Sequence, residues 1–356
     1  MHEPGSARNE LVAALRSLVT FAPGPGSRGW IAARAALSMG LPLAALTLSG
    51  YPGLGLQVST GGFLALFFAG NAAAERARTL PFIAVALGAC AALGAWLAPA
   101  PWLAATGLIA VAVVTSALAF AFRVGPPGPM FFTLVYGLAG MITAARDADR
   151  GTEPLAFLLA FGCGLLFSYL VALTPLLLPA RRAIRPRPLR ELLPGPWLGA
   201  GERWLVVRVA AVATIGTVVS MIWVDPSRAY WTVAAGIAVI GLSTVPNHSF
   251  ARGLHRTLGT LVGAAVYLLI APLAQLPWAF VLLLPALQFV IELVVVRNYG
   301  LALVFITPLV LFIAGAATGS SDHFATALER LVDTAFGSAL AMVSGVLRER
   351  PAVASR

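Results

Sequence analysis

Charged side chains inside apolar stretches are the features of this sequence that could do chemistry. Asp333 lies within the last apolar run, 325–347, too deep for its short side chain to reach water. A charge inside a membrane-spanning helix costs about 2.5 to 3.5 kcal/mol on insertion scales, so it needs a partner or a function. Two hypotheses follow for Asp333. It forms a structural ion pair, with Arg330 as its i, i+3 partner, or it takes up and releases a proton, since burial favours a neutral carboxyl group.

Glu292 is the second deep acid of the sequence. It lies in the run 276–296, about as far from the expected cytoplasmic end of that run as Arg208 lies from the cytoplasmic end of the run 204–223. We therefore expect Glu292 to pair with Arg208 or with Arg256, which would neutralise both charges in lipid. Glu292 and Asp333 are the predicted proton-coupling residues.

Two arginines follow a tryptophan by four residues: Arg34 after Trp30, and Arg208 after Trp204. This spacing places each arginine about one helical turn above its tryptophan. The long side chains could extend back to the cytoplasmic headgroups. They could equally point into a helix bundle and attract an anion at its cytoplasmic mouth.

Other chemistries are excluded by residues that the sequence lacks. All 24 basic residues are arginine, so a P-loop or a Schiff-base catalyst has no lysine. The four histidines, at 2, 248, 255 and 323, lack metal-ligand spacing, and no GxSxG elbow occurs. Cys90 and Cys163 both lie in apolar runs. We expect no enzyme activity, no cofactor and no metal site.

Membrane helices are the structural elements expected to carry these residues. The chain is 59% hydrophobic and 11% charged, with a mean hydropathy of +0.87, whereas soluble domains are about a quarter charged. The sequence predicts an all-α polytopic membrane protein with about twelve transmembrane helices, since spans need about 17 to 25 residues. The runs are 30–49, 54–72, 79–98, 101–122, 129–145, 155–178, 204–223, 229–246, 256–273, 276–296, 300–318 and 325–347.

The distribution of arginine predicts the orientation. Only Arg146, Arg150, Arg228 and Arg330 fall at the face opposite the other arginines, so the positive-inside rule places both termini in the cytoplasm. Arginines that cluster at the ends of runs also explain the net charge of +10 without a nucleic-acid partner. We expect a multi-pass protein of the bacterial inner membrane. An amphipathic helix with Leu11, Val12, Leu15, Leu18 and Val19 precedes the first span and is expected to lie on the membrane surface.

The sequence repeats itself. Trp30-Ile-Ala-Ala-Arg34 resembles Trp204-Leu-Val-Val-Arg208, and Arg78-Thr-Leu resembles Arg256-Thr-Leu. Two parallel six-helix repeats, with a substrate path between them, explain this order. The predicted parts are a cytoplasmic segment 1–29, a first repeat 30–178, a basic linker 179–203, a second repeat 204–347 and a cytoplasmic tail 348–356.

Interrupted helices indicate where a ligand would bind. Pro308, after Thr307, removes a hydrogen bond from the eleventh run, and Gly125-Pro-Pro-Gly-Pro129 breaks the start of the fifth. Interruptions at corresponding positions place the site near these two runs. The GxxxG pair of Gly259 and Gly263 predicts close helix contact instead.

The second half resembles a known family. Its landmarks are Arg208, Tyr230-Trp231-Thr, Arg252, Arg256-Thr-Leu-Gly259, Arg297-Asn-Tyr299-Gly, Thr307-Pro308 and Glu329-Arg330-Leu-Val-Asp333. These are similar to the fusaric acid resistance protein-like (FUSC) family, which includes aromatic acid exporters. The first half departs from the pattern, because Gln57-Val-Ser-Thr60 stands where the second has Tyr230-Trp231-Thr232.

The resemblance implies proton-driven export of small organic anions such as aromatic carboxylates. The residues expected to bind the substrate are Arg208, Tyr230, Trp231, Arg256, Arg297, Tyr299 and Thr307. Tyr230 and Trp231 have an alternative role as anchors at the outer interface. Two other functions stay open: a passive anion channel, because the family is similar to plant aluminium-activated malate transporters, and a non-transporting membrane scaffold. The expected partners are the anion, the lipid bilayer and further copies of the chain in a homo-oligomer.

Overall fold

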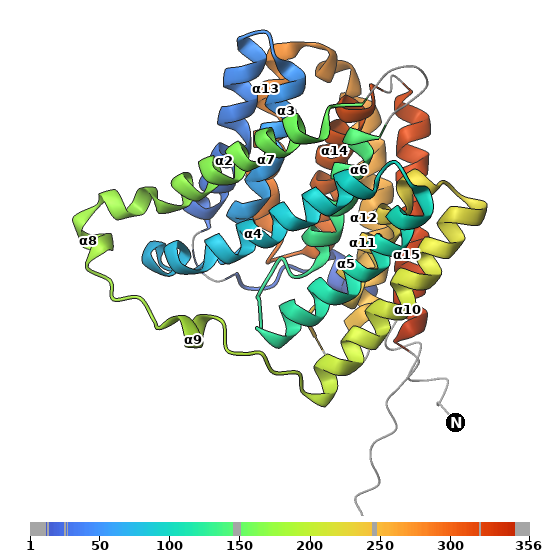
Figure 1. The fold of residues 1–356 in the computed structure, drawn as a ribbon, viewed down its shortest axis with the longest axis horizontal. Helices are drawn as coiled ribbons and strands as arrows, with labels where there is room; N and C mark the ends of the chain where they lie inside the picture. Colours follow the sequence, from blue (N-terminus) through green and yellow to red (C-terminus); the bar gives the residue numbers. More distant parts are fainter. Residues whose placement is uncertain are drawn as a thin grey trace, which may run out of the picture.

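The computed structural model describes residues 12, 14–24, 26, 28–144, 151–243, 248–319 and 322–345, and all regular structure in them is helical (Figure 1). The first group of helices is α2 (Gly29–Leu48), α3 (Pro52–Thr60), α4 (Ala73–Leu97), α5 (Pro101–Ala121), α6 (Met130–Thr143) and α7 (Pro154–Leu173). The second group is α10 (Ala200–Trp223), α11 (Ala229–Ile240), α12 (His248–Ile270), α13 (Pro277–Val294), α14 (Tyr299–Thr318) and α15 (His323–Ser344). Short pieces join them: η1 (Gly61–Leu66), η2 (Thr174–Leu177), α8 (Pro179–Arg182), α9 (Leu189–Leu192), η3 (Pro226–Arg228) and η4 (Ala271–Gln275). The predicted tail, 348–356, lies outside the described residues.

Eight of these helices are long and apolar enough to cross a membrane. The prediction of an all-helical, multi-pass membrane protein is therefore confirmed. Each of the twelve predicted runs contains a helix, but α3, α6 and α11 have only 9, 14 and 12 residues, fewer than the roughly 20 that a span needs. α15 has 22 residues but is not among the eight candidate spans, because charged side chains lower its hydropathy.

Helix starts follow local sequence chemistry. Proline occupies the first position of α3, α5, α7 and α13, where its missing N–H costs no hydrogen bond. The Asn298 side chain accepts a hydrogen bond from the Leu301 N–H at 2.8 Å and caps α14. This cap fixes the position of Tyr299, the first residue of that helix.

The two groups of helices contact each other through corresponding members. α2 packs against α13, and α5 packs against α10, so the first helix of each group meets the fourth helix of the other (Figure 1). Within the groups, α4 packs on α6 as α12 packs on α14. The linker with α8 and α9 runs along the periphery to α10 (Figure 1). We call the end of the bundle where α2 and α10 begin the basic end.

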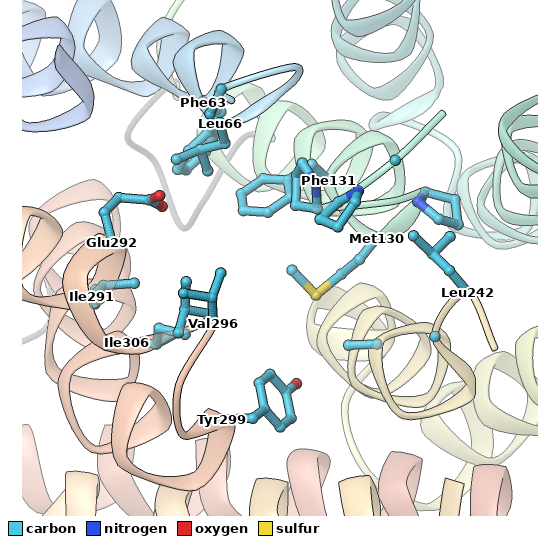
Figure 2. A pocket seen from close by; sticks show the side chains of 18 of the residues that line it. Phe63, Leu66, Met130, Phe131, Leu242, Ile291, Glu292, Val296, Tyr299 and Ile306 are labelled. Carbon is cyan, nitrogen blue, oxygen red and sulfur yellow. The ribbon is translucent and has the colours of Figure 1, made fainter. Parts of the chain in front are cut away.

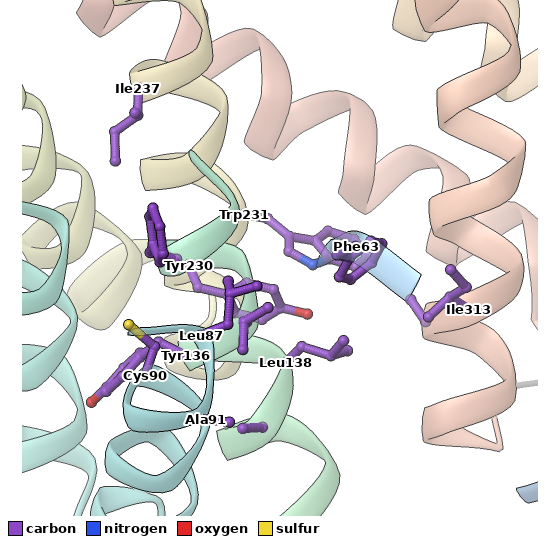
Figure 3. Close-up of a cluster of buried hydrophobic side chains, with 14 of the residues drawn as sticks. Phe63, Leu87, Cys90, Ala91, Tyr136, Leu138, Tyr230, Trp231, Ile237 and Ile313 are labelled. Atoms are coloured by element: carbon purple, nitrogen blue, oxygen red, sulfur yellow. The ribbon is translucent and has the colours of Figure 1, made fainter. Parts of the chain in front are cut away.

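α11 lies at the centre of the molecule, and all twelve of its residues are buried. It contacts α6, where Gly137 leaves space for the Tyr230 ring. Figure 3 shows Tyr230 and Trp231 in this hydrophobic cluster with Tyr136. A helix enclosed by protein does not have to match the thickness of the bilayer, which explains how α11 can be short.

Two expectations about packing have different outcomes. Gly259 contacts Gly300, and Gly263 contacts Thr307, so the predicted close contact at the GxxxG pair is confirmed between α12 and α14. The N-terminal segment is helical over 14–19, but it does not simply lie on a membrane surface. Ser17 hydrogen-bonds His255 at 2.7 Å, and the Asn298 amide donates to the Leu18 carbonyl at 2.7 Å. Leu11 lies outside the described residues.

Candidate functional site: an arginine-lined cavity

A cavity of about 1150 Å³ lies between the two groups of helices (Figure 2). Its walls come from η1, α6, α11, α12, α13, α14 and α15, so both interrupted runs, the fifth and the eleventh, contribute to it. Most of the wall is apolar or aromatic. The apolar residues that line it include Phe63, Leu66, Met130, Phe131, Ile291, Val296 and Ile306.

Positive charge exceeds negative charge in this cavity. Among the described residues, its lining contains six arginines and two glutamates, and these are Arg28, Arg123, Arg187, Arg252, Arg256 and Arg330 with Glu191 and Glu292. Guanidinium groups bind carboxylates and phosphates in bidentate geometry. A cavity with apolar walls and excess arginine therefore favours an organic anion.

The cavity reaches the surface at the basic end. Its lining includes residues from the connections α5–α6 and α13–α14, from the start of α12 and from the linker. None of the described residues in the connections at the opposite end, 49–51, 98–100, 151–153, 224–228 and 271–276, lines it. The cavity is thus open toward one end of the bundle only.

Tyr299 lies between two arginines at the wall of the cavity. Its hydroxyl accepts a hydrogen bond from Arg256 Nη1 at 2.7 Å, and the Arg252 guanidinium carbon lies 4.2 Å from its ring centroid. Arg256 is only 4% exposed, and its Nε has no hydrogen-bond partner among the described residues. A buried donor without a partner is costly, so Arg256 retains capacity to bind an anion.

Arg330 lines the cavity, as Arg28 and Arg252 do, but was not among the predicted substrate-binding residues. We expected it at the face opposite the basic end, yet it is 5% exposed and lines the cavity. Its Nε and Nη1 have no hydrogen-bond partner among the described residues, and it interacts electrostatically with Arg256. The sequence feature that could have indicated a buried position for Arg330 is its place in α15, three residues before Asp333.

Glu292 extends into the cavity near its mouth (Figure 2). Arg28 Nη2 lies 3.0 Å from the Glu292 carboxylate, and Arg28 Nε donates to the Glu292 backbone oxygen at 2.9 Å. The prediction that Glu292 pairs with Arg208 or Arg256 is therefore wrong. Arg28 replaces them because α2, which follows it, packs directly against α13.

Asp333 does not line the cavity. It is 2% exposed, and its closest cation is Arg228, whose Nε lies 3.8 Å away. Arg228 also contacts Glu329 at 2.8 Å and Asp225 at 3.5 Å. The ion pair runs to Arg228 rather than to the expected i, i+3 partner, although Arg330 interacts electrostatically with Asp333.

Arg208 is buried outside the cavity lining, where neutral groups accept its hydrogen bonds. Its Nε donates to Ser344 Oγ at 3.1 Å, and its Nη2 donates to Ser249 Oγ at 2.8 Å. Tyr230 and Trp231 also lie outside the lining and are buried, so the interpretation as exposed interfacial anchors is wrong.

Arg297 and Thr307 complete the predicted set and also lie outside the cavity lining. The Arg297 carbonyl accepts from the Ala22 N–H at 2.9 Å, and Thr307 Oγ1 donates within its helix to the Leu303 carbonyl at 2.8 Å. The structure therefore brings together Arg256, Tyr299 and Glu292 of the predicted residues. Among the described residues, no group of three or more His, Cys, Asp or Glu side chains is placed to hold a metal ion.

Comparison with known proteins shows that the C-terminal part of the chain is similar to a family of membrane proteins. Residues 211–344 match the family model described as fusaric acid resistance protein-like. The uncharacterized membrane protein YvaC of Bacillus subtilis (strain 168) is 32% identical over 124 residues, which cover 34% of this chain and 19% of YvaC. No solved structure matches the chain significantly. The matched segment 211–344 supplies α11 to α15 and both Arg256 and Arg330, so the C-terminal part of this multi-helix membrane protein is similar to fusaric acid resistance protein-like proteins.

Proposed function

We propose that this chain is a secondary transporter that exports small organic anions across the bacterial inner membrane. The observation that carries the proposal is the cavity itself, in which six arginines and two glutamates line a largely apolar space. The match to a fusaric acid resistance protein-like family supports a transporter-type membrane protein. The match does not identify the substrate, so we infer the substrate class from the residues that line the cavity.

The lining favours a carboxylate attached to an apolar or aromatic group. Arg256 and Arg330 supply unpaired N–H donors for the carboxylate. Phe63 and Phe131 supply aromatic wall on which a ring can pack. Arg28 and Arg252 nearer the mouth attract the anion from solution.

The proposed architecture has twelve helices in two parallel repeats, both with their termini in the cytoplasm. It is supported by the exchange of packing partners, in which α2 with α13 mirrors α10 with α5. In this arrangement the short helices α6 and α11 lie at the wall of the binding site. The basic end then faces the cytoplasm, and the cavity loads from that side.

Transport is proposed to be coupled to protons through Glu292 and Asp333. Glu292 is the acid that reaches the cavity from a spanning helix, and its protonation would release Arg28 and change the charge at the mouth. Asp333 lies in the ion-pair network beyond the closed end, where protonation would weaken its attraction to Arg228. Two acids at opposite ends of the path suit alternating access.

A carrier fits the cavity better than the alternatives. A passive channel needs a continuous path, whereas this cavity is open toward one end only. A scaffold that transports nothing has no use for buried arginines with unpaired donors at the wall of a cavity.

The direct test uses the purified full chain in proteoliposomes loaded with radiolabelled benzoate, with malate as a non-aromatic comparison. We expect benzoate efflux that a proton gradient accelerates and that Arg256→Gln reduces at least tenfold, because a charge-assisted hydrogen bond contributes about 1.5 to 3 kcal/mol. Arg182→Gln, which removes an exposed arginine outside the cavity lining, is the matched control. Efflux that matches protein-free vesicles would reject transport of this class, and conduction that ignores the proton gradient would favour a channel.

A further inference from the structure

A second, smaller cavity of about 200 Å³ lies on the outside of the first group of helices at the basic end. The start of α2, the start of α4 and the α8 segment form its walls. Its lining includes Trp30, Ile31, Arg34, Arg76, Arg181 and Ile184. It contains three arginines and no acidic residue among the residues that line it.

The two buried arginines of this pocket have no carboxylate partner. Arg34 and Arg76 are 6% and 4% exposed, and no salt bridge to either occurs among the described residues. The nearby acid Glu75 is engaged elsewhere, because its carboxylate accepts from Arg187 Nε at 2.8 Å and thereby raises the pKa of the Arg187 guanidinium. Glu292 attracts Arg34 and Glu75 attracts Arg76, but neither acid lies within ion-pair distance, so two buried cations that repel each other have no direct anionic partner.

Arg34 makes fewer hydrogen bonds to protein groups than Arg76 does. Arg76 donates from Nε and Nη2 to the Ala172 carbonyl at 3.2 and 2.8 Å, and from Nη1 to the Asn71 carbonyl. Arg34 donates from Nη2 to the Ala69 carbonyl at 2.7 Å, while its Nε has no partner among the described residues. A buried guanidinium with an unused donor beside a cavity indicates a ligand that accepts hydrogen bonds.

The corresponding arginine of the second Trp-x-x-x-Arg motif does not line such a pocket. Arg208 follows Trp204 as Arg34 follows Trp30, yet Arg208 binds Ser249, Ser344 and the Ala341 carbonyl. Its site is closed by protein groups, whereas that of Arg34 opens into a pocket.

We propose that this pocket binds the phosphate group of an anionic phospholipid. Its volume holds several water molecules at about 30 Å³ each, and so accommodates a phosphate. Trp30 and Ile184 are exposed apolar side chains that line the pocket and would contact the acyl chains. Basic pockets at the cytoplasmic face of membrane helices suit such headgroups. The lipid would neutralise Arg34 and Arg76 and tie α2 and α4 to the linker.

Native mass spectrometry of the full chain in detergent tests this, with phosphatidylglycerol, phosphatidylcholine and inorganic phosphate titrated separately. We expect phosphatidylglycerol to bind at least tenfold more tightly than phosphatidylcholine. Arg34→Gln and Arg181→Gln should each weaken phosphatidylglycerol binding about tenfold, the effect of one lost charge-assisted hydrogen bond. Arg182→Gln removes the adjacent exposed charge that does not line the pocket and should leave binding unchanged.

Equal binding by the wild type, Arg34→Gln and Arg181→Gln would overturn the proposal. Inorganic phosphate that binds as tightly as phosphatidylglycerol would also overturn it, because the site would then serve a free anion. If Arg34→Gln fails to fold, the exposed Arg181 still decides the outcome, since its substitution removes no buried contact.

Discussion

The guanidinium carbon of Arg330 lies 4.9 Å from the centroid of the Trp231 ring. This contact joins α15 to the buried helix α11 at the wall of the cavity. An aromatic face holds a guanidinium by cation–π attraction without occupying its N–H groups. Trp231 therefore orients Arg330 and leaves its Nε and Nη1 donors available to a ligand.

Arg330→Gln should lower the affinity for benzoate about ten- to a hundredfold, because one charge-assisted hydrogen bond contributes about 1.5 to 3 kcal/mol. Arg330→Lys keeps the charge but loses the planar fork, so it should recover only part of the affinity. Equilibrium binding to the purified chain is the measurement, with Arg190→Gln in the exposed linker as the control. Wild-type affinity in Arg330→Gln would exclude this residue from the site.

Glu292→Gln should separate transport from its driving force. Exchange of labelled for unlabelled benzoate should persist, while accumulation against a gradient driven by protons should be lost, because the amide cannot carry a proton. Glu191→Gln is the matched control, since Glu191 also lines the cavity but is exposed on the linker. Loss of coupling in both variants, or in neither, would contradict a specific role for Glu292.

Asp333→Asn should likewise abolish proton-driven efflux, measured in proteoliposomes at a fixed benzoate gradient. Glu329→Gln removes an acid from the same network but one that is half-exposed, with 44% of its side chain accessible against 2% for Asp333. Efflux by Glu329→Gln should stay near the wild-type rate. An unchanged rate in Asp333→Asn would remove this residue from the coupling mechanism.

Gly137→Ala should destabilise the bundle by about 1 to 3 kcal/mol, the usual cost of overpacking. The added methyl group would clash with the Tyr230 ring and push α6 away from α11. Gly162→Ala is the control, because no atom lies within 4 Å of a Cβ at that glycine. Thermal unfolding in detergent should show a lower midpoint for Gly137→Ala alone.

Orientation can be measured by cysteine labelling in a Cys90→Ser, Cys163→Ser background. A membrane-impermeant maleimide should label Ser227→Cys in intact cells but label Arg190→Cys only after permeabilisation. Both positions are exposed and lie at opposite ends of the bundle. The reverse pattern would place the basic end and the cavity mouth outside the cell.

The class of the protein and the positions of its helices along the chain follow from the pattern of residue types alone. Apolar runs separated by arginine, proline and glycine leave lipid as the environment, and hydrogen bonding in lipid leaves helices as the local structure. The GxxxG pair in α12 also predicted its close contact, because small residues four apart form one flat helix face. Hydropathy, helix formation and a face of small residues depend on the local sequence, so they do not depend on how the segment packs in the folded protein.

Which charged groups meet depends on how the helices pack against one another. Helical periodicity fixes which side chains share a face, but it does not fix which helix lies opposite. Glu292 pairs with Arg28, 264 residues away, because α2 packs on α13 across the two groups. Arg330 enters the cavity because α15 packs against both α11 and α12. The residues that form the site are therefore determined by contacts between helices that are distant in the sequence. The reason is that the free energy of a buried charge depends on neighbours that belong to other helices.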